Sequence, residues 1–436
     1  MLMKDCMRYL SYVKIGRLNS QINDAILAPA GRGRFFTNRR SLMNAYLILE
    51  DGTVFAGEAF GAERETICEI VFNTGLTGYL ELLTDASYAG QAIVMSSPVI
   101  GNYGVFVEHG EADRPWAEAL IVRDLTHLVH DPRSAEDLDE YLTRNDIPGI
   151  KGIDTQQLTL RLREHGTMNG MITTAEDYNI DNCLASIKSW RNHRPVERVS
   201  RKTKAVFPAG AIGRVYRDED IDQELLNKLP SEAMKPLGYQ LDESIDKRFN
   251  VAMLDFGLKQ NIVWNLTRRG CEVTVYPWNT PMDEIIATSP EGVMLSNGPG
   301  DPMDCADILP GIRQLHDSGI PTFAICLGHQ LMALATGAST KRLKYGHRGI
   351  NHPAQDIETG RVYITSQNHG YVVIDETIDS TVADISHRHL NDNSVEGLRY
   401  KNGTVRTVQY HPEGAPGPLD SDYLFDEFMD MMVREV

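Results

Sequence analysis

The second half of the sequence consists of short apolar segments separated by stretches long enough for a helix. The segments VAMLDFG, EVTVYPW, GVMLSNGPGDP and TFAICLG follow one another from Phe249 onward, and we predict a strand in each. Strands that alternate with helices in this way form a parallel sheet covered on both faces. Ligands of such sheets bind beyond the carboxyl ends of the strands. We therefore expect an α/β domain over residues 249–436, with its functional residues at the strand ends.

Cys326 occupies one of these strand ends. The apolar residues up to Ile325 predict a buried strand, and the apolar spacing from Leu327 onward predicts a helix. A strand-to-helix elbow exposes the side chain at its turn, and the positive end of the following helix favours a thiolate. A lone cysteine after an apolar strand is more often an inert core residue. Cys326 alone is therefore weak support for a nucleophile.

Two further strand ends carry groups that complement a thiol. In VQYHPEG, His411 can act as a base and Glu413 can orient it. In LSNGPGDP, Gly298 and Gly300 leave backbone N–H groups exposed, and these can stabilise an oxyanion together with the N–H of Leu327. An ordinary loop or a tight turn would explain each segment taken singly. Their convergence at three strand ends predicts a thiol-dependent catalytic site.

The first 42 residues differ from the rest of the chain in charge. Residues 1–42 hold eight Lys and Arg against two Asp and Glu, so they carry +6 in a chain whose net charge is −17. We expect a dispensable basic extension ahead of an internal start at Met43. The alternative is an organellar transit peptide, because such peptides are basic and poor in acidic residues. The expected location is cytoplasmic, or an organelle stroma or matrix under that alternative.

Residues 43–195 are expected to form a smaller, mixed domain rich in β-strands. Apolar and polar residues alternate on both sides of Asp51 and Gly52, a pattern typical of a hairpin. The segment SAEDLDEYLTRND predicts a helix with Ser134 as its N-cap. Residues 196–248 contain no long periodic segment, so we expect an extended connection to the second domain.

Composition narrows the classes of partner. The net charge and a pI near 5.2 argue against nucleic acid or an anionic membrane, and no apolar run is long enough to span a membrane. The six cysteines show no CxxC spacing, which favours reduced thiols, and no GxxxxGK[ST] nucleotide-binding loop occurs. His347, His352, His387 and His389 are not paired with carboxylates or cysteines at a ligand spacing, so we expect no metal site.

Several motifs resemble a known family. ICLGHQ, SNGPGDP and YHPEG are similar to motifs of the class I, triad-type glutamine amidotransferases, which implies a flavodoxin-like second domain. LDFGLKQNI, KYGHRGINHP, TSQNHGY, FNTGLTGYLELLTDASYAGQ and GIDTQQLTLRLREHGTMNG narrow the resemblance to the small, glutamine-hydrolysing subunit of carbamoyl-phosphate synthetase, from about Met43 to the C-terminus. The resemblance implies that Cys326 is the nucleophile, His411 the general base and acid, and Glu413 its orienting partner.

The resemblance also implies the residues that contact glutamine. By position these are Gly298, Gly300, Leu327, Gln330, Asn368, Gly370 and Tyr371. A further contact comes from the first domain, where the family usually has serine in FNTS. This chain has Gly75 there, so the contact would come from backbone or from a neighbour. Ala324 replaces a glycine often found before the Ile-Cys pair, and His369 is expected to be a packing or positioning group.

The implied activity is half of a larger reaction. The small subunit releases ammonia from glutamine and passes it through an interior tunnel to a large subunit, which makes carbamoyl phosphate from bicarbonate and ATP for pyrimidine or arginine biosynthesis, or both. We therefore expect no cofactor on this chain and ATP with Mg on the large subunit. The alternatives are a non-catalytic regulatory module, a stand-alone γ-glutamyl hydrolase, and an amidotransferase that makes guanylate or anthranilate. An intact triad and the first-domain motifs argue against them.

Overall fold

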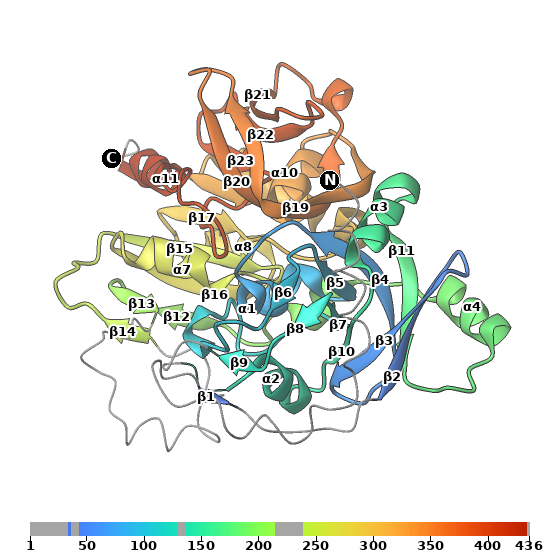
Figure 1. Cartoon of the computed structure of the whole chain (residues 1–436). Helices are drawn as coiled ribbons and strands as arrows, with labels where there is room; N and C mark the ends of the chain where they lie inside the picture. The colour runs from blue at the N-terminus through green and yellow to red at the C-terminus, as the bar shows by residue number, and fades with distance from the viewer. Residues whose placement is uncertain (1–33, 36–42, 130–133, 135, 214–238, 434–436) are drawn as a thin grey trace, which may run out of the picture.

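The computed structural model describes residues 34–35, 43–129, 134, 136–213 and 239–433. These residues include a closed seven-stranded barrel, blue to green in Figure 1, followed by a ten-stranded sheet, which is yellow to red apart from its green edge strand β12. The expected basic extension over residues 1–42 lies outside the described residues, apart from the short β1 (Arg34–Phe35). The middle of the expected connecting segment, residues 214–238, lies outside them as well.

The barrel has the strand order β10-β3-β2-β11-β4-β5-β7. Its strands are β2 (Asn44–Leu49), β3 (Val54–Gly61), β4 (Thr66–Asn73), β5 (Gln91–Met95), β7 (Ala119–Ile121), β10 (Pro148–Lys151) and β11 (Met168–Thr173). β2 and β3 pair antiparallel, which confirms the predicted hairpin. Asp51 Oδ1 accepts the Thr53 N–H at 2.9 Å, and Gly52 has φ 87°, a left-handed conformation that glycine adopts readily.

The first part of the chain contains further elements around the barrel. They are α1 (Tyr79–Thr84), η2 (Ala86–Tyr88), β6 (Val99–Ile100), η3 (Val107–His109), β8 (Asp124–Leu125), β9 (Leu128–Val129), α2 (Leu138–Arg144), α3 (Thr155–His165), α4 (Ile180–Ser189) and α5 (Pro195–Val199). The helix predicted over SAEDLDEYLTRND is α2, but Ser134 is not its N-cap. Asp137 caps α2 by accepting the Glu140 N–H at 2.8 Å, and Ser134 Oγ instead accepts the Val105 N–H at 2.9 Å. Aspartate caps a helix as well as serine does, so propensity does not distinguish the two positions.

The second sheet confirms the predicted parallel strands and extends beyond them. Its order is β12-β16-β15-β17-β18-β23-β22-β21-β19-β20, and the five strands from β16 to β23 are parallel. The remaining strands are antiparallel additions at the two edges. The strands are β12 (Ala205–Phe207), β15 (Phe249–Asp255), β16 (Cys271–Pro277), β17 (Gly292–Leu295), β18 (Thr322–Ile325), β19 (Thr340–Asp356), β20 (Val362–Val373), β21 (Ala383–His389), β22 (Val395–Tyr400) and β23 (Val405–Val408).

Helices cover both faces of this sheet. They are α7 (Gln260–Thr267), α8 (Met282–Ile286), η5 (Pro302–Ile308), α9 (Leu309–Ser318), α10 (Leu327–Ala335), η6 (Asp375–Thr377) and α11 (Tyr423–Val433), with the small pair β13 (Ala211–Gly213) and β14 (Tyr239–Leu241) nearby. Ala252 and Leu254 of β15 pack with α8, α9 and α10, whereas Val251 and Met253 pack with α7 and α11. This alternation follows from the two-residue period of a strand. None of the described helices is long and apolar enough to cross a membrane.

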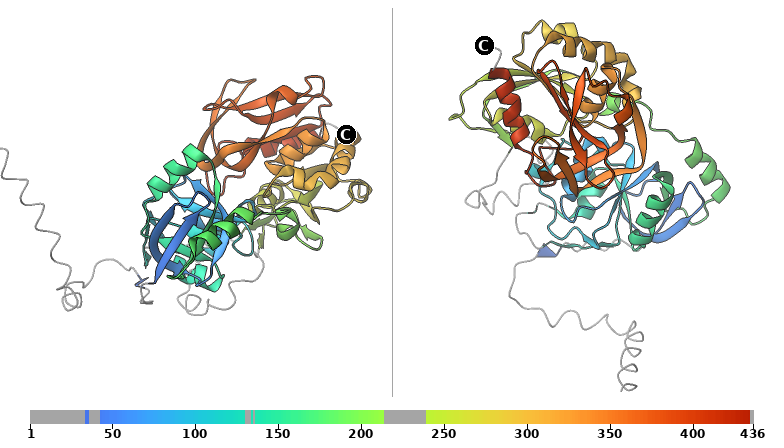
Figure 2. Two further views of the ribbon diagram at one scale, coloured as in Figure 1. Left: turned by 90° about the vertical axis from the view of Figure 1, so that its right-hand side faces the viewer. Right: turned by 90° about the horizontal axis from the view of Figure 1, so that it is seen from above.

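The barrel and the sheet pack against each other, as the two views in Figure 2 show. Polar side chains join them next to the carboxyl ends of the central strands. Asn297, just after β17, donates through Nδ2 to Ser87 Oγ of η2 at 2.9 Å. Asn368 of β20 donates through Nδ2 to Asp85 Oδ2 at 3.0 Å. The strand ends of the second domain therefore face the segment 79–88 of the first.

We predict that Gly328→Ala destabilises the second domain, because α10 packs directly on β17 at this position. A Cβ on Gly328 would lie 2.5 Å from Leu295 O, a backbone atom that cannot turn aside. Overpacking of this kind costs about 1–3 kcal/mol. Thermal melting should show a lowered transition. Gly311→Ala on α9 is the matched control, because the nearest atom to its Cβ would be the Met282 Cβ at 3.3 Å, and its melting temperature should stay close to wild type. Equal melting temperatures for both variants would contradict the tight packing.

Candidate functional site

Cys326 lies at the turn between β18 and α10. Its backbone has φ 54° and ψ −103°, a region that residues other than glycine rarely occupy. Its N–H donates to Val408 O of the neighbouring β23 at 2.8 Å, which ties the turn to the sheet. Strained backbone persists where its surroundings hold it, and here it forms an elbow of the kind that exposes a nucleophile. The Cys326 side chain lines a cavity at this edge of the sheet.

His411 and Glu413 follow β23, the strand next to β18. His411 Nδ1 and Glu413 Oε1 are 2.6 Å apart, and the two side chains are 1% and 0% exposed. Burial alone would lower the pKa of His411, but the Glu413 carboxylate outweighs burial and raises this pKa to about 10. The carboxylate therefore orients the ring and favours its protonated form.

The other ring nitrogen of His411, Nε2, is buried and has no well-aligned hydrogen-bond partner among the described residues. The Cys326 thiol also raises the pKa of His411. Because Glu413 occupies Nδ1, we infer that the thiol faces Nε2. Cys326 Sγ also lies 3.8 Å from Asn368 O. The structure thus brings Cys326, His411 and Glu413 together.

Lys259 is a member of this cluster that the sequence reasoning missed. Its Nζ lies 3.0 Å from Glu413 Oε1 and donates to Gly414 O at 2.7 Å, and its side chain is 2% exposed. Burial would lower the pKa of Lys259, but nearby carboxylates, above all that of Glu413, raise it. Burial would likewise raise the pKa of Glu413, but Lys259 and His411 lower it to about 2. Glu413 is therefore an anion held by two cations. Lys259 lies in the motif LDFGLKQNI, and this motif was the one feature of the sequence that could have pointed to it.

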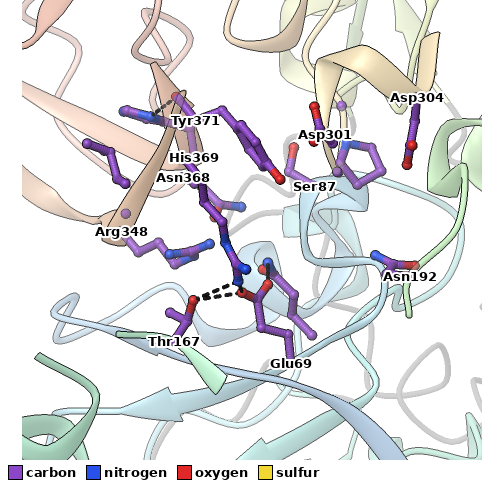
Figure 3. A pocket seen from close by; sticks show the side chains of 18 of the residues that line it. Glu69, Ser87, Thr167, Asn192, Asp301, Asp304, Arg348, Asn368, His369 and Tyr371 are labelled. Atoms are coloured by element: carbon purple, nitrogen blue, oxygen red, sulfur yellow. Dashed lines mark hydrogen bonds and ion pairs between the residues drawn. The ribbon is translucent and has the colours of Figure 1, made fainter. Parts of the chain in front are cut away.

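A cavity of about 410 Å³ opens in front of Cys326. Figure 3 shows its two walls, one from the second domain with Asn368, His369 and Tyr371 and one from the first domain with Glu69 and Thr167. Burial would raise the pKa of Glu69, but the guanidinium groups of Arg348 and Arg342 lower it. The cavity is therefore polar and lies between the two domains, as many ligand sites do.

Most of the predicted glutamine contacts lie around this cavity. Its lining includes Cys326 and the predicted Gly298, Gly300, Gln330, Asn368, Gly370 and Tyr371. Gln330 is held by donation from Nε2 to Tyr371 O at 2.8 Å and to Gln409 Oε1 at 2.9 Å. A Cβ on Gly298 would lie 2.3 Å from Phe256 O, so only glycine fits this turn. Leu327 is buried at the first position of α10 and does not line the cavity with its side chain.

Gly75 lies apart from this group and does not line the cavity in the described part of the chain. Its N–H donates to Asn73 Oδ1 at 2.6 Å, which closes a local turn after β4. Two first-domain residues with a hydroxyl group line the cavity, Thr167 and Ser87; Thr167 Oγ1 donates to Glu69 Oε1 at 2.7 Å, and Ser87 lies beside Asn297. Asp85 Oδ1 accepts the Ser87 N–H at 2.9 Å and so fixes η2 against Asn297. Ser87 lies in the motif TDASY, whereas the expected contact at Gly75 was placed from the FNTS motif.

Two groups of side chains have ligand atoms close enough together to hold a metal ion. They are His347, His389 and Asp392, and His347, His369 and Glu396, with ligand atoms within 4.8 Å of one another. His347 Nε2 lies 2.9 Å from Asp392 Oδ2 and Nδ1 lies 3.5 Å from Glu396 Oε1. Spacing along the chain did not reveal these carboxylates. Burial would lower the pKa of His347, but the two carboxylates raise it to about 9. In its doubly protonated form the ring presents one N–H toward each carboxylate and has no lone pair for a metal.

We predict that His347 makes stability depend on pH. Because its folded pKa lies above the unfolded value of 6.5, its contribution is fully present below pH 6.5 and is lost as the pH rises through 9. Melting temperatures of wild type should therefore fall between pH 6.5 and 9.5 by more than those of His347→Gln. His165→Gln, which changes an exposed histidine, is the control and should behave as wild type. Parallel pH curves for wild type and His347→Gln would contradict the prediction.

Comparison with known proteins adds two matching family models. Carbamoyl-phosphate synthase small chain, CPSase domain, matches residues 47–172, and Glutamine amidotransferase class-I matches residues 252–431. A protein of Bacillus caldolyticus named carbamoyl phosphate synthase small chain is 42% identical over 394 residues, covering 90% of this chain and 97% of that protein.

Two further relatives have similar names. A carbamoyl phosphate synthase small chain of Listeria monocytogenes is 44% identical over 387 residues, covering 88% of this chain and 96% of that protein. A carbamoyl phosphate synthase pyrimidine-specific small chain of Lactiplantibacillus plantarum is 42% identical over 392 residues, covering 89% and 96%. Identity at this level over nearly the whole length confirms the resemblance seen in the motifs. The chain therefore belongs to the carbamoyl phosphate synthase small chain family.

Proposed function

We propose that this chain is the glutamine-hydrolysing subunit of a carbamoyl phosphate synthase, with Cys326 as nucleophile, His411 as general base and acid, and Glu413 as orienting carboxylate. One observation carries the proposal: a cysteine on a strained elbow stands beside a buried His–Glu pair and opens into a polar cavity. The family membership supports it, because the relatives match both halves of the chain.

The chemistry follows from the order of these groups. The raised pKa of His411 keeps the proton of Cys326 on the imidazole ring, and the thiolate attacks the side-chain carbonyl of glutamine. Backbone N–H groups at Leu327 and at the Gly298–Gly300 turn are the proposed donors to the tetrahedral oxyanion, and the loss of one such donor typically costs about 3–4 kcal/mol. His411 then protonates the leaving nitrogen, which departs as ammonia. Water activated by His411 hydrolyses the thioester and releases glutamate.

The charges around His411 suit both steps. Glu413 favours the imidazolium that forms when His411 accepts the thiol proton, and Lys259 keeps Glu413 ionised. Glutamine, the proposed substrate, would be held by Gly298, Gly300, Gln330, Asn368, Gly370 and Tyr371, with Leu327 contributing its backbone. Ser87 takes the first-domain position that Gly75 was expected to fill.

Ammonia is useful only if it reaches a second reaction. The proposed partner is a large subunit that binds ATP and Mg and makes carbamoyl phosphate from bicarbonate. The product would serve pyrimidine biosynthesis, arginine biosynthesis or both, and one relative is named pyrimidine-specific. We further propose a cytoplasmic location and a division into residues 43–195, 196–248 and 249–436, which the ranges of the two family models support.

Replacing the nucleophile should separate the two half-reactions. Cys326→Ser is expected to abolish carbamoyl phosphate synthesis from glutamine, because a serine in this setting is a far weaker nucleophile, and to leave synthesis from ammonia by the two-subunit complex intact. Both rates are measured on the same preparation. Cys305→Ser is the control: Cys305 is also buried but lies in the core on η5, so it should retain both activities. Equal loss of both activities in Cys326→Ser would contradict the assignment.

The first-domain contact is tested by comparing Ser87→Ala with Gly75→Ala. Ser87→Ala removes a hydroxyl from the cavity wall, so the KM for glutamine should rise by about tenfold, the loss expected for one hydrogen bond of about 1.4 kcal/mol. Gly75→Ala should leave this KM within twofold, because Gly75 does not line the cavity. Steady-state glutaminase assays measure both. A raised KM in Gly75→Ala alone would restore the contact expected from the sequence.

A further inference from the structure

Glu111 of the first domain reaches across the domain interface to the start of α7. Its carbonyl oxygen accepts the Gln260 N–H at 2.9 Å, and its carboxylate accepts the Asn261 N–H at 3.1 Å and a second bond from Asn261 Nδ2. The Glu111 N–H donates to Thr84 Oγ1 of its own domain at 2.8 Å. Glu111 is 1% exposed. A loop after η3 is thereby joined to the first turn of α7.

This contact provides hydrogen-bond acceptors for the first N–H groups of α7, which its own N-cap residue does not bind. The first N–H groups of a helix have no partner within the helix, and a carboxylate at that end also interacts favourably with the helix dipole. The N-cap position of α7 is Lys259, whose side chain makes no capping bond because it extends to Glu413. Glu111 therefore supplies the cap from another domain, and Lys259 is left free to hold the carboxylate that orients His411.

The charges around Lys259 also link Glu111 to the site. Lys259 faces the carboxylates of Glu413, Glu111 and Asp85, in that order of strength, and Glu81 also faces it, with His109 beside Glu81. The positive charge of Lys259 lowers the pKa of His411. Glu111 is thus a second counter-charge that limits the effect of Lys259 on the imidazolium. Burial raises the pKa of Glu111 to about 7, and Lys259 and Asn261 oppose this rise.

We propose that Glu111 is a positioning residue for the triad, acting through α7 and Lys259 and making the catalytic geometry depend on the docked first domain. The proposal rests on the proposed function of Cys326, His411 and Glu413. It gives the first domain a role in the glutaminase reaction itself, beyond the wall it contributes to the cavity. Glu111 touches neither the cavity nor the thiol in the described structure.

The test is the pH profile of glutaminase activity in Glu111→Gln. Glutamine keeps one acceptor for Asn261 and removes the charge, so the variant should fold. Without the charge of Glu111, Lys259 lowers the pKa of His411 further. The alkaline limb of kcat/KM, which reports loss of the imidazolium proton, should therefore move to lower pH. We expect kcat to fall on the order of tenfold through misplacement of the triad, with KM changed less than threefold. Glu111→Asp retains the charge and should restore the position of the limb.

Glu118→Gln is the matched control. Glu118 is another first-domain carboxylate, and it pairs with Arg198 at 3.2 Å, away from Lys259. It should leave the limb and kcat unchanged. A purely structural role of Glu111 would lower the melting temperature and scale activity equally at every pH, and an unmoved limb in Glu111→Gln would overturn the proposal. Failure of the proposed function is recognised separately, because wild type would then release no ammonia from glutamine or would do so equally well with Cys326→Ser.

Discussion

A buried carboxylate shared by two cations holds the site together. Glu413 lies in contact with His411 and Lys259, and none of the three side chains is more than 2% exposed. Removing one partner of a buried ion pair costs about 3–5 kcal/mol because it leaves an uncompensated charge. The three groups therefore require one another, and the arrangement keeps the ring of His411 oriented toward Cys326. The strained turn at Cys326 lies beside this ring, as the proposed role of a nucleophile requires.

The first domain completes the site as well as flanking it. Asp85 and Ser87 bond to residues next to the strand ends of the second domain, and Glu111 caps the helix that carries Lys259. Buried polar groups that are fully hydrogen-bonded hold their partners in one arrangement. The geometry of the site in this chain consequently depends on how the two domains dock. The first domain contributes the cap of α7, a counter-charge to Lys259 and one wall of the cavity.

Particular residues show which features of the fold and the site could be predicted from the sequence and which could not. The elbow at Cys326 and the parallel strands around it could be predicted because each depends on local apolar pattern and on the period of strands and helices. The roles of Lys259 and Ser87 were missed although both residues lie in quoted motifs, because a motif does not say which side chain lies opposite it in the fold. The carboxylates around His347 were missed for a related reason: Asp392 and Glu396 are distant in the chain and meet His347 only across the antiparallel half of the sheet.

The amino-acid order determined by itself the α/β pattern of the second half, the family, and the types of residue at the strand ends. These are local properties, written in apolar spacing, turn residues and short motifs. Only the tertiary structure decided which charges meet, that Glu413 is shared with Lys259, that Ser87 and not Gly75 lines the cavity, and that Glu111 caps α7. The physical reason is that electrostatic and hydrogen-bond energies depend on distance and burial, which folding sets between segments far apart in the chain.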